Sequence, residues 1–197
     1  MEEKNMTEKK KDNTKTAYIH LAPGFEEIEA LTCADWLRRA GIDAKLVSVT
    51  GKREVLGVHS ILVQADILFE DADYDSCEMI ILPGGMPGAT NLEAHSGLAL
   101  QIQAFAKAGK LLAAICAAPL ALATHGALEG KEATIYPGME DRLRGARATG
   151  DNVTVCGNVI TGAGPDVASE FALKLIEVLE GKEARDSVAA DILFDRR

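Results

Sequence analysis

The apolar positions of the chain follow two alternating patterns, short continuous runs and runs at helical spacing. The continuous runs occupy residues 17–22, 79–82 and 111–115 and are typical of buried strands, and alternation of apolar and polar residues predicts a further strand over 42–49. The helical spacing predicts helices over residues 26–40, 91–108, 119–125 and 165–179. Because strands alternate with helices, the pattern predicts an α/β fold whose mostly parallel central sheet is covered by helices on both faces.

Shorter elements fill the gaps between these segments. Apolar runs and turn residues predict a β excursion near 55–58 and 61–63, a strand-like segment at 133–136, a hairpin at 153–161 and a terminal helix from Glu183. Parallel strands present their carboxyl ends at one edge of a sheet, where such folds bind ligands. We therefore expect four loops to meet at that edge, namely those at Pro23, Pro83, Cys116 and Gly162.

The helix predicted over 26–40 combines an apolar stripe with an acidic first turn. The stripe consists of Ile28, Leu31, Ala34 and Leu37. Complementarity to the helix dipole accounts for Glu26 and Glu27. Glu29 differs, because it follows the stripe residue Ile28 and is placed to point inward towards the crevice.

Composition and charge narrow the classes of function. With 197 residues, 47% of them hydrophobic, the chain suits one domain, which we place at 16–197 after a polar, disordered tail at 1–15. The net charge of -9 disfavours nucleic acid as a partner. No apolar stretch has the character of a signal peptide or the length of a membrane span, so we expect a cytoplasmic protein with no membrane partner.

The motifs of common cofactor sites are missing from the sequence. The four cysteines, at positions 33, 77, 116 and 156, lack the spacing of a zinc site. Neither a dinucleotide-binding fingerprint nor a Walker motif occurs. We therefore expect no metal and no cofactor, and we expect free thiols in a reducing compartment.

One cysteine stands where a thiol has chemical use. The buried run 111–115 stops at Cys116, and small residues lead from there into a helix. Small neighbours suit a strand-to-helix elbow, which forces backbones together and exposes the sulfur at a helix N-terminus. For the other three cysteines we prefer the common alternative, a buried core position. The loop at 83–88 is either a plain connection or a source of backbone N–H donors for an oxyanion beside Cys116.

A cysteine hydrolase also needs a histidine base. His20 lies within the first strand and is expected to be structural, whereas His95 and His125 fall on helices or their ends and are expected to be solvated. His59 lies in the β excursion. The active-edge position after the strand-like segment holds Tyr136, which disfavours hydrolysis by a Cys–His pair.

Three segments resemble the ThiJ/PfpI superfamily, in particular its DJ-one branch. They are GFEEIEA at 24–30, LPGGMPGATNL at 82–92 and AAICAAP at 113–119, and TGAGPDVASEFAL at 161–173 adds support. The resemblance runs from about residue 16 to the C-terminus. It implies a flavodoxin-like three-layer α/β/α sandwich and usually a homodimer.

The resemblance also implies roles for single residues. It makes Cys116 the reactive cysteine, Glu29 a protonated carboxyl that hydrogen-bonds the thiolate, and Gly85 and Ala117 backbone donors around the sulfur. Members of the family are described as redox-responsive proteins whose cysteine oxidises to sulfinate. They are also described as glyoxalases and as deglycases that act on methylglyoxal and glyoxal adducts.

This sequence departs from the family at the rim of the expected pocket. Tyr136 replaces a frequent histidine, while Ala163 and His59 replace arginines found in some relatives. These changes disfavour the histidine-dependent subgroup and reduce the capacity to bind anions. We expect Tyr136, Gly84 and Pro165 to line the pocket, and we expect His59 to offer an anion contact.

Acidifying the thiol requires more than a helix dipole. Lowering a thiol pKa from about 8.5 by about three units takes roughly 4 kcal/mol. The dipole supplies about 2 kcal/mol at most, and a charge-assisted hydrogen bond adds roughly 1.5–3 kcal/mol. A protonated Glu29 would be that donor, whereas an ionised Glu29 would raise the thiol pKa. We expect the two groups to titrate as a pair that shares one proton.

These observations lead to two hypotheses from different classes. The first is an enzyme of the deglycase or glyoxalase type, in which Cys116 attacks a small reactive carbonyl or glycated substrate and Glu29 shuttles the proton. The second is a redox sensor or chaperone that uses the same thiolate without turnover. An intracellular peptidase is disfavoured by Tyr136, and a thiazole monophosphate biosynthesis protein finds no phosphate-binding motif.

Overall fold

The computed structural model describes residues 14–194. Most of the tail expected at 1–15 therefore lies outside the described residues. Lys15, the last residue of that segment, is tied to the folded chain: its ammonium group pairs with Glu78 at 3.1 Å, and its carbonyl accepts the N–H of Asp43 at 2.8 Å. The folded chain thus includes Lys15, one residue before the predicted boundary.

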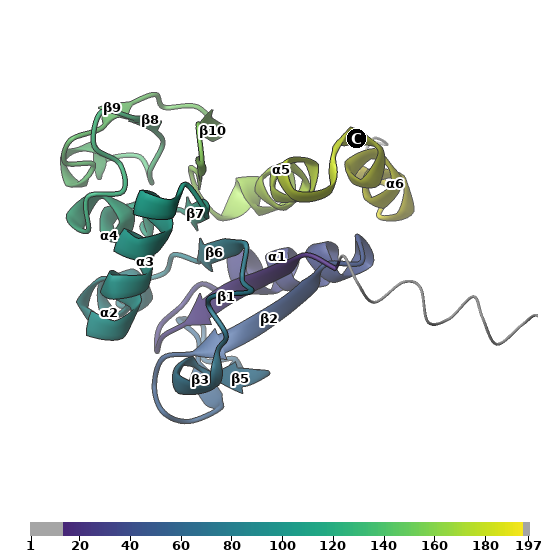
Figure 1. The fold of residues 1–197 in the computed structure, drawn as a ribbon, viewed down its shortest axis with the longest axis horizontal. Coiled ribbons are helices and arrows are strands. Elements are labelled where there is room, and N and C mark those ends of the chain that lie inside the picture. The colour runs from purple at the N-terminus through teal and green to yellow at the C-terminus, as the bar shows by residue number, and fades with distance from the viewer. Residues whose placement is uncertain (1–13, 195–197) are drawn as a thin grey trace, which may run out of the picture.

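A seven-stranded sheet forms the centre of the molecule (Figure 1). In spatial order it contains β10 (Val153–Cys156), β11 (Val159–Gly162), β7 (Leu111–Ile115), β6 (Met79–Leu82), β1 (Thr16–Leu21), β2 (Asp43–Ser48) and β5 (Ile67–Leu68). Every neighbouring pair is parallel except the hairpin of β10 and β11. The prediction of a mostly parallel sheet is confirmed, and the central strands are apolar because both faces are covered.

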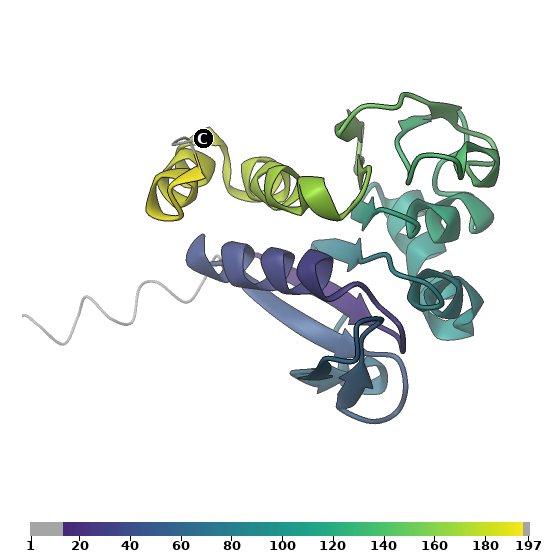
Figure 2. The same ribbon diagram turned by 180° about the vertical axis from the view of Figure 1, so that it is seen from behind.

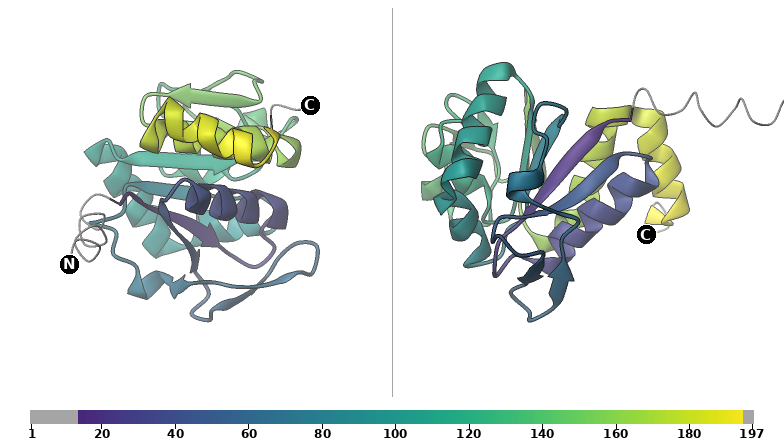
Figure 3. Two further views of the ribbon diagram at one scale, coloured as in Figure 1. Left: turned by 90° about the vertical axis from the view of Figure 1, so that its right-hand side faces the viewer. Right: turned by 60° about the horizontal axis from the view of Figure 1, so that its bottom comes forward.

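Helices cover both faces, which confirms the three-layer sandwich (Figure 3). One layer contains α1 (Glu27–Arg39), α5 (Ala168–Glu180) and α6 (Lys182–Asp191), and Figure 2 shows α1 beside α5. The other contains α2 (Gly88–Ala94), α3 (Ser96–Ala108) and α4 (Pro119–Thr124). None of the helices within residues 14–194 combines the length and the apolar character that crossing a membrane requires.

Shorter elements lie in the connections between these strands and helices. They are β3 (Glu54–Leu56) and β4 (Leu62–Gln64), which form an antiparallel hairpin, β8 (Glu132–Ala133) and β9 (Arg147–Ala148), and the 3-10 turns η2 (Phe69–Asp71), η3 (Glu140–Arg142) and η4 (Pro165–Val167). The strand expected at 133–136 is shorter than predicted. It ends at Ala133, and Tyr136 donates its N–H to the Cys116 carbonyl instead of a strand partner.

The single helix predicted over 91–108 is two helices. The chain breaks at His95, whose backbone is extended and whose Nδ1 accepts the N–H of Leu98 at 3.0 Å. That side chain caps α3 and so replaces one of the hydrogen bonds that the break in the helix removes. The apolar spacing continues across the break, which is why periodicity alone predicts one helix.

The apolar stripe predicted for α1 is half right: Ala34 and Leu37 are buried as expected, but Ile28 and Leu31 are not. Ile28 is 52% exposed and Leu31 38% exposed, whereas Ala30, Cys33 and Leu37 face the core. Glu29 lies on this buried face, as expected, but it is not carried there by an inward-facing Ile28. The buried face of α1 therefore combines Leu37 with small and polar side chains, among them Glu29.

Candidate active site

Cys116 occupies the predicted elbow between β7 and α4. Its φ angle is 61°, in the left-handed region that costs an ordinary residue about 1–2 kcal/mol. Two backbone bonds hold it there: its N–H donates to the Gly162 carbonyl at 2.8 Å, and its carbonyl accepts the N–H of Tyr136 at 2.9 Å. The residue is 8% exposed, so the thiol is more enclosed than the sequence suggests. Strain held at a single cysteine is typical of functional sites.

The carboxyl group of Glu29 lies against this thiol. Glu29 is fully buried, and its Oε2 accepts the N–H of Gly84 at 2.7 Å. The side chain also has the Cys116 thiol as a hydrogen-bond partner, and its Oε1 is buried with no partner within the described residues. The first turn of α1 therefore delivers one buried carboxyl group to the elbow.

Glycine and alanine let three backbone segments converge on the sulfur. A Cβ at Gly84 would lie 2.6 Å from the Cβ of Cys116, and Gly85 adopts a φ of 83°. The backbone N–H groups of Gly85 and Ala117 hydrogen-bond the thiol. The structure thus brings together Cys116, Glu29, Gly84, Gly85 and Ala117, all of which the sequence singled out.

The charges of Cys116 and Glu29 depend on which of the two groups holds a single shared proton. Burial raises the pKa of Glu29 to about 7, against the opposing effects of the Gly84 N–H and the thiol. Burial and an ionised Glu29 raise the pKa of Cys116 to about 12, while the Gly85 and Ala117 N–H groups lower it. The thiol is therefore acidic only while the proton resides on Glu29. The expected thiolate below pH 8 requires that arrangement.

Tyr136 and Pro165 line one cavity, as predicted. Its volume is about 320 Å³, and one wall is formed by Tyr136 and Pro137 and the other by residues 163–167. It adjoins the elbow, because Tyr136 hydrogen-bonds the Cys116 backbone directly and Gly162 precedes the second wall. The prediction that Gly84 lines the same cavity is wrong: Gly84 packs against Cys116 and donates its N–H to Glu29.

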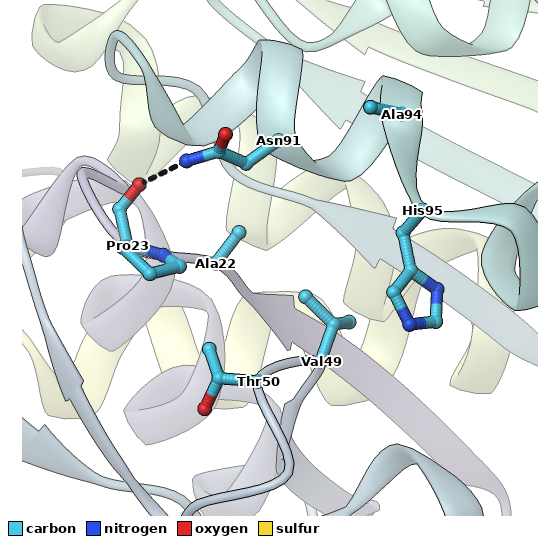
Figure 4. Close-up of a pocket in the computed structure, with 7 residues that line it drawn as sticks. All are labelled: Ala22, Pro23, Val49, Thr50, Asn91, Ala94 and His95. Atoms are coloured by element: carbon cyan, nitrogen blue, oxygen red, sulfur yellow. Dashed lines mark hydrogen bonds between the residues drawn. The ribbon is translucent and has the colours of Figure 1, made fainter.

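A slightly larger cavity, of about 340 Å³, lies where the loops after β1 and β2 meet α2. Asn91 donates its side-chain amide to the Pro23 carbonyl at 2.9 Å along one wall, and His95 stands across from them (Figure 4). Neither Cys116 nor Glu29 lines either cavity. The smaller cavity is the better candidate for substrate, because its lining residue Tyr136 and the neighbouring Gly162 hydrogen-bond the backbone of Cys116, the only strained cysteine among the described residues.

The His59 side chain pairs with two carboxylates of its own chain. Its Nδ1 lies 3.1 Å from Glu27 and 3.5 Å from Glu26, and the three side chains bring ligand-type atoms within 4.8 Å of one another. Glu27 is buried and also accepts the N–H groups of His59 and Ile61, at 2.8 and 3.4 Å. The cluster therefore clamps the β3–β4 hairpin to α1. A contact of His59 with a substrate anion stays a prediction.

Sequence reasoning missed this clamp, because it assigned Glu27 to the helix dipole. A signal was available at Gly57, where any Cβ would collide with the Glu27 side chain. A glycine inside the predicted β excursion is typical of such a close approach.

The remaining cysteines and histidines divide between core and surface. Cys33 and Cys77 are buried, as predicted, and burial raises their pKa values. Cys156 is only half-buried, because it lies beside the turn of the edge hairpin. His20 is fully buried, and its Nε2 lies 2.7 Å from the Tyr74 hydroxyl, which confirms a structural role.

The expectation that His95 and His125 are solvated is wrong. Both are half-buried, since His95 caps α3 and His125 hydrogen-bonds the carbonyl of Glu93 at 2.9 Å.

Comparison with known proteins agrees with this geometry. Residues 15–178 match the DJ-1/PfpI family. Protein dj-1beta of Drosophila melanogaster is 38% identical over 91% of this chain and 97% of its own. A nematode relative, named glutathione-independent glyoxalase DJR-1.2 of Caenorhabditis elegans, is 33% identical over 88% of this chain and 94% of its own.

A solved structure repeats the fold. The oxidized DJ-1 of Toxoplasma gondii superposes with a TM-score of 0.86 at 37% identity, covering 91% of this chain and 98% of its own. The match spans the sheet, both helical layers and the segments that build the elbow. The chain therefore belongs to the DJ-1/PfpI family.

Proposed function

We propose that this protein is a cysteine-dependent glyoxalase that converts small α-oxoaldehydes such as methylglyoxal to 2-hydroxy acids without glutathione. The observation that carries the proposal is the Cys116 thiol, held between two backbone N–H donors and a buried carboxyl group. The nematode relative named a glutathione-independent glyoxalase supports the same reaction type. Deglycation of protein or nucleotide adducts would use the same first step.

The reaction begins with attack of the Cys116 sulfur on the aldehyde carbon. A C–S bond forms, and the carbonyl electron pair moves to oxygen, where the Gly85 and Ala117 N–H groups stabilise the negative charge. The proton on Glu29 then neutralises that oxygen. The product of this step is a hemithioacetal, and Glu29 is left ionised and ready to act as a base.

Glu29 next moves a proton between the two carbons. Its carboxylate removes the proton from the former aldehyde carbon, and the electron pair moves onto the neighbouring carbonyl oxygen, which gives an enediolate. The hydroxyl proton of the first carbon passes to that oxygen, and Glu29 returns its proton to the second carbon, which gives a 2-hydroxy thioester and leaves Glu29 ionised. Water then cleaves the C–S bond. The 2-hydroxy acid leaves, and the thiol is restored. The balance is one α-oxoaldehyde and one water consumed for each 2-hydroxy acid formed.

The placement of hydrogen-bond donors supports a negative charge on sulfur. Two backbone N–H groups serve Cys116, whereas the carboxyl group of Glu29 receives one, from Gly84. A carboxyl group that is fully buried with one such donor is poorly solvated when ionised, and burial raises its pKa to about 7. The donor count favours the arrangement in which Glu29 holds the proton and Cys116 holds the charge. Burial also raises the pKa of Cys116, so the proposal requires that the two N–H donors and a protonated Glu29 outweigh the burial of the sulfur.

The test is turnover of methylglyoxal in the absence of glutathione. We expect the wild-type protein to form lactate and Cys116→Ser to form none, while Cys156→Ser, which removes a half-buried thiol elsewhere, retains the activity. Equal activity of the wild-type and Cys116→Ser proteins would remove Cys116 from the mechanism.

A second candidate function is redox sensing by the same thiolate. Its support is the enclosed, hydrogen-bonded sulfur and the solved relative described as oxidized. Two peroxide molecules would each transfer one oxygen to the sulfur and leave as water, giving a sulfinate. We expect limiting peroxide to add two oxygens at Cys116 before it modifies Cys156. Equal modification of both, measured by peptide mass spectrometry, would argue against a sensor.

We further propose that the protein is a homodimer. Large apolar side chains lie exposed on α1 and on the adjoining hairpin, and we call this set the apolar face: Ile28, Leu31, Leu56, Val58, Ile61 and Leu62. The Glu27 clamp joins the two elements, so the face is continuous. An exposed apolar surface of this kind favours a second copy of the chain, in line with the homodimer that the resemblance implies.

A further inference from the structure

The cavity beside the elbow has an apolar lining. Tyr136 and Pro137 form one wall, and Ala163, Pro165 and Val167 supply the side chains of the other. Its volume of about 320 Å³ lies near the lower end of the range, about 300–1,000 Å³, that small-molecule pockets occupy. A compact substituent therefore fits, and apolar contact is what this cavity offers it.

The ring of Tyr136 gives the cavity a flat side. A Cβ at Gly164 would lie 3.4 Å from the Cδ2 of Tyr136, so the ring lies next to the backbone of the opposite wall. The side chain is 48% exposed, which leaves the rest of the ring available to a ligand. A flat aromatic surface of this kind prefers an aromatic partner, in offset or edge-to-face contact.

The charge at the cavity is negative. Its only charged lining residue within the described chain is Asp166, which is exposed at the rim, and no lysine, arginine or histidine lines it. The protein as a whole carries a net charge of -9. A carboxylate on a bound substrate would therefore lose water without gaining a cationic partner, and Asp166 would repel it.

The cavity is fixed relative to the thiol. The N–H of Tyr136 donates to the Cys116 carbonyl at 2.9 Å, and the N–H of Cys116 donates to Gly162, one residue before the second wall. Both walls are thus anchored to the backbone of the reacting residue. Cys116 does not itself line the cavity, but these two backbone bonds hold the cavity next to the elbow, where the second substituent of a substrate bound at the sulfur can reach it.

We propose that this cavity selects α-oxoaldehydes whose second substituent is apolar and uncharged, with an aromatic ring preferred over a methyl group. This inference rests on the proposed glyoxalase function and adds the substrate class to it. The selection follows from contact with Tyr136 and from the lack of a cationic partner for carboxylates.

The experiment compares three probes without glutathione: methylglyoxal, phenylglyoxal and 4-carboxyphenylglyoxal. The last two share a ring and differ by one remote carboxylate. We expect kcat/KM for phenylglyoxal to exceed that for methylglyoxal by about tenfold, the scale on which apolar contacts discriminate. We expect the carboxylated probe to lose about tenfold relative to phenylglyoxal, since its charge gains no partner. Each rate is referred to the reaction of the same probe with a free thiol, which removes differences in electrophilicity.

Two variants at Ala163, one charged and one neutral, test whether the missing cation causes the discrimination against carboxylates. Ala163→Arg places a cation on the cavity wall, and Ala163→Gln supplies similar length without charge. We expect the arginine variant, and not the glutamine variant, to narrow the preference for phenylglyoxal over its carboxylated form by about fivefold or more.

The outcomes separate the inference from the function on which it rests. Turnover of all three probes with equal efficiency, or with the carboxylated probe preferred, would overturn the substrate class while leaving the glyoxalase proposal standing. Failure to turn over any of the three would overturn both. The wild-type ratios alone decide the question if the arginine variant does not fold.

Discussion

Replacing Glu29 by alanine tests which group of the pair holds the proton. The substitution removes the buried carboxyl group that hydrogen-bonds Cys116 and leaves the N–H donors of Gly85 and Ala117 in place. If Glu29 is protonated, its loss removes a donor from the thiolate, and the pKa of Cys116 rises. If Glu29 is ionised, its loss removes a repelling charge, and the pKa of Cys116 falls. The sign of the change therefore identifies the proton's position.

The size of the change follows from the hydrogen bond. A bond from a neutral donor to a charged group contributes about 1.5–3 kcal/mol, and one pKa unit corresponds to about 1.4 kcal/mol. We therefore expect Glu29→Ala to raise the pKa of Cys116 by about 1–2 units. Glu29→Gln should give a smaller rise, because its amide oxygen can still accept from Gly84 while its NH₂ group donates to the sulfur.

The assay is the rate of alkylation of Cys116 by iodoacetamide as a function of pH, followed in the peptide by mass spectrometry. We expect a wild-type midpoint well below pH 8, and a higher midpoint in both variants. Glu26→Gln is the matched control, since it removes a neighbouring charge on the same turn without removing the hydrogen bond. A midpoint that falls in Glu29→Ala would refute the shared-proton reasoning.

Three further substitutions test other parts of the structure. Burial lowers the pKa of His20 to about 3, against an ordinary value of 6.5, so the folded state loses stability as pH falls below 6.5. Between about pH 7.5 and about pH 5.5 the loss in the free energy of unfolding is about 1.4 kcal/mol. Urea unfolding of His20→Phe should show a pH dependence that is smaller by that amount. Leu62→Asp should shift the mass measured by light scattering from dimer to monomer, whereas Leu100→Asp, equally exposed but on α3, should not. Glu27→Ala leaves hairpin N–H groups without their acceptor and should lower the free energy of unfolding by about 1–3 kcal/mol, with Glu26→Ala changing it less.

The fold could be predicted from local patterns because its central strands are buried on both sides. Continuous apolar runs such as 79–82 and 111–115 have few alternative interpretations when helices separate them. The break at His95 could not be predicted in the same way, since a capping side chain leaves the apolar period intact. The exposure of Ile28 and Leu31 on α1 was equally hidden, because most residues that face the core in the first half of that helix are small or polar.

The features of the site likewise divide into those that the sequence predicts and those that it does not. The elbow at Cys116 and the glycines at 84 and 85 could be predicted, because close backbone approach leaves small residues in the sequence. The clamp formed by Glu27 joins segments far apart in the chain, and Gly57 is its one local signal. The residues Tyr136 and Pro165 of the cavity were expected from the family resemblance and not from a local pattern. The location of one proton between Cys116 and Glu29 depends on burial and on donor count, which only the structure supplies.

The central claim is that Cys116 and Glu29 together convert an α-oxoaldehyde to a 2-hydroxy acid. Proton NMR of methylglyoxal turnover in D₂O, without glutathione, measures this most directly. We expect the wild-type protein to form lactate carrying deuterium at the carbon next to the carboxylate, because Glu29 exchanges its proton with solvent, and Cys116→Ser to form none. Lactate produced equally by Cys116→Ser, or no lactate from the wild-type protein, would contradict it.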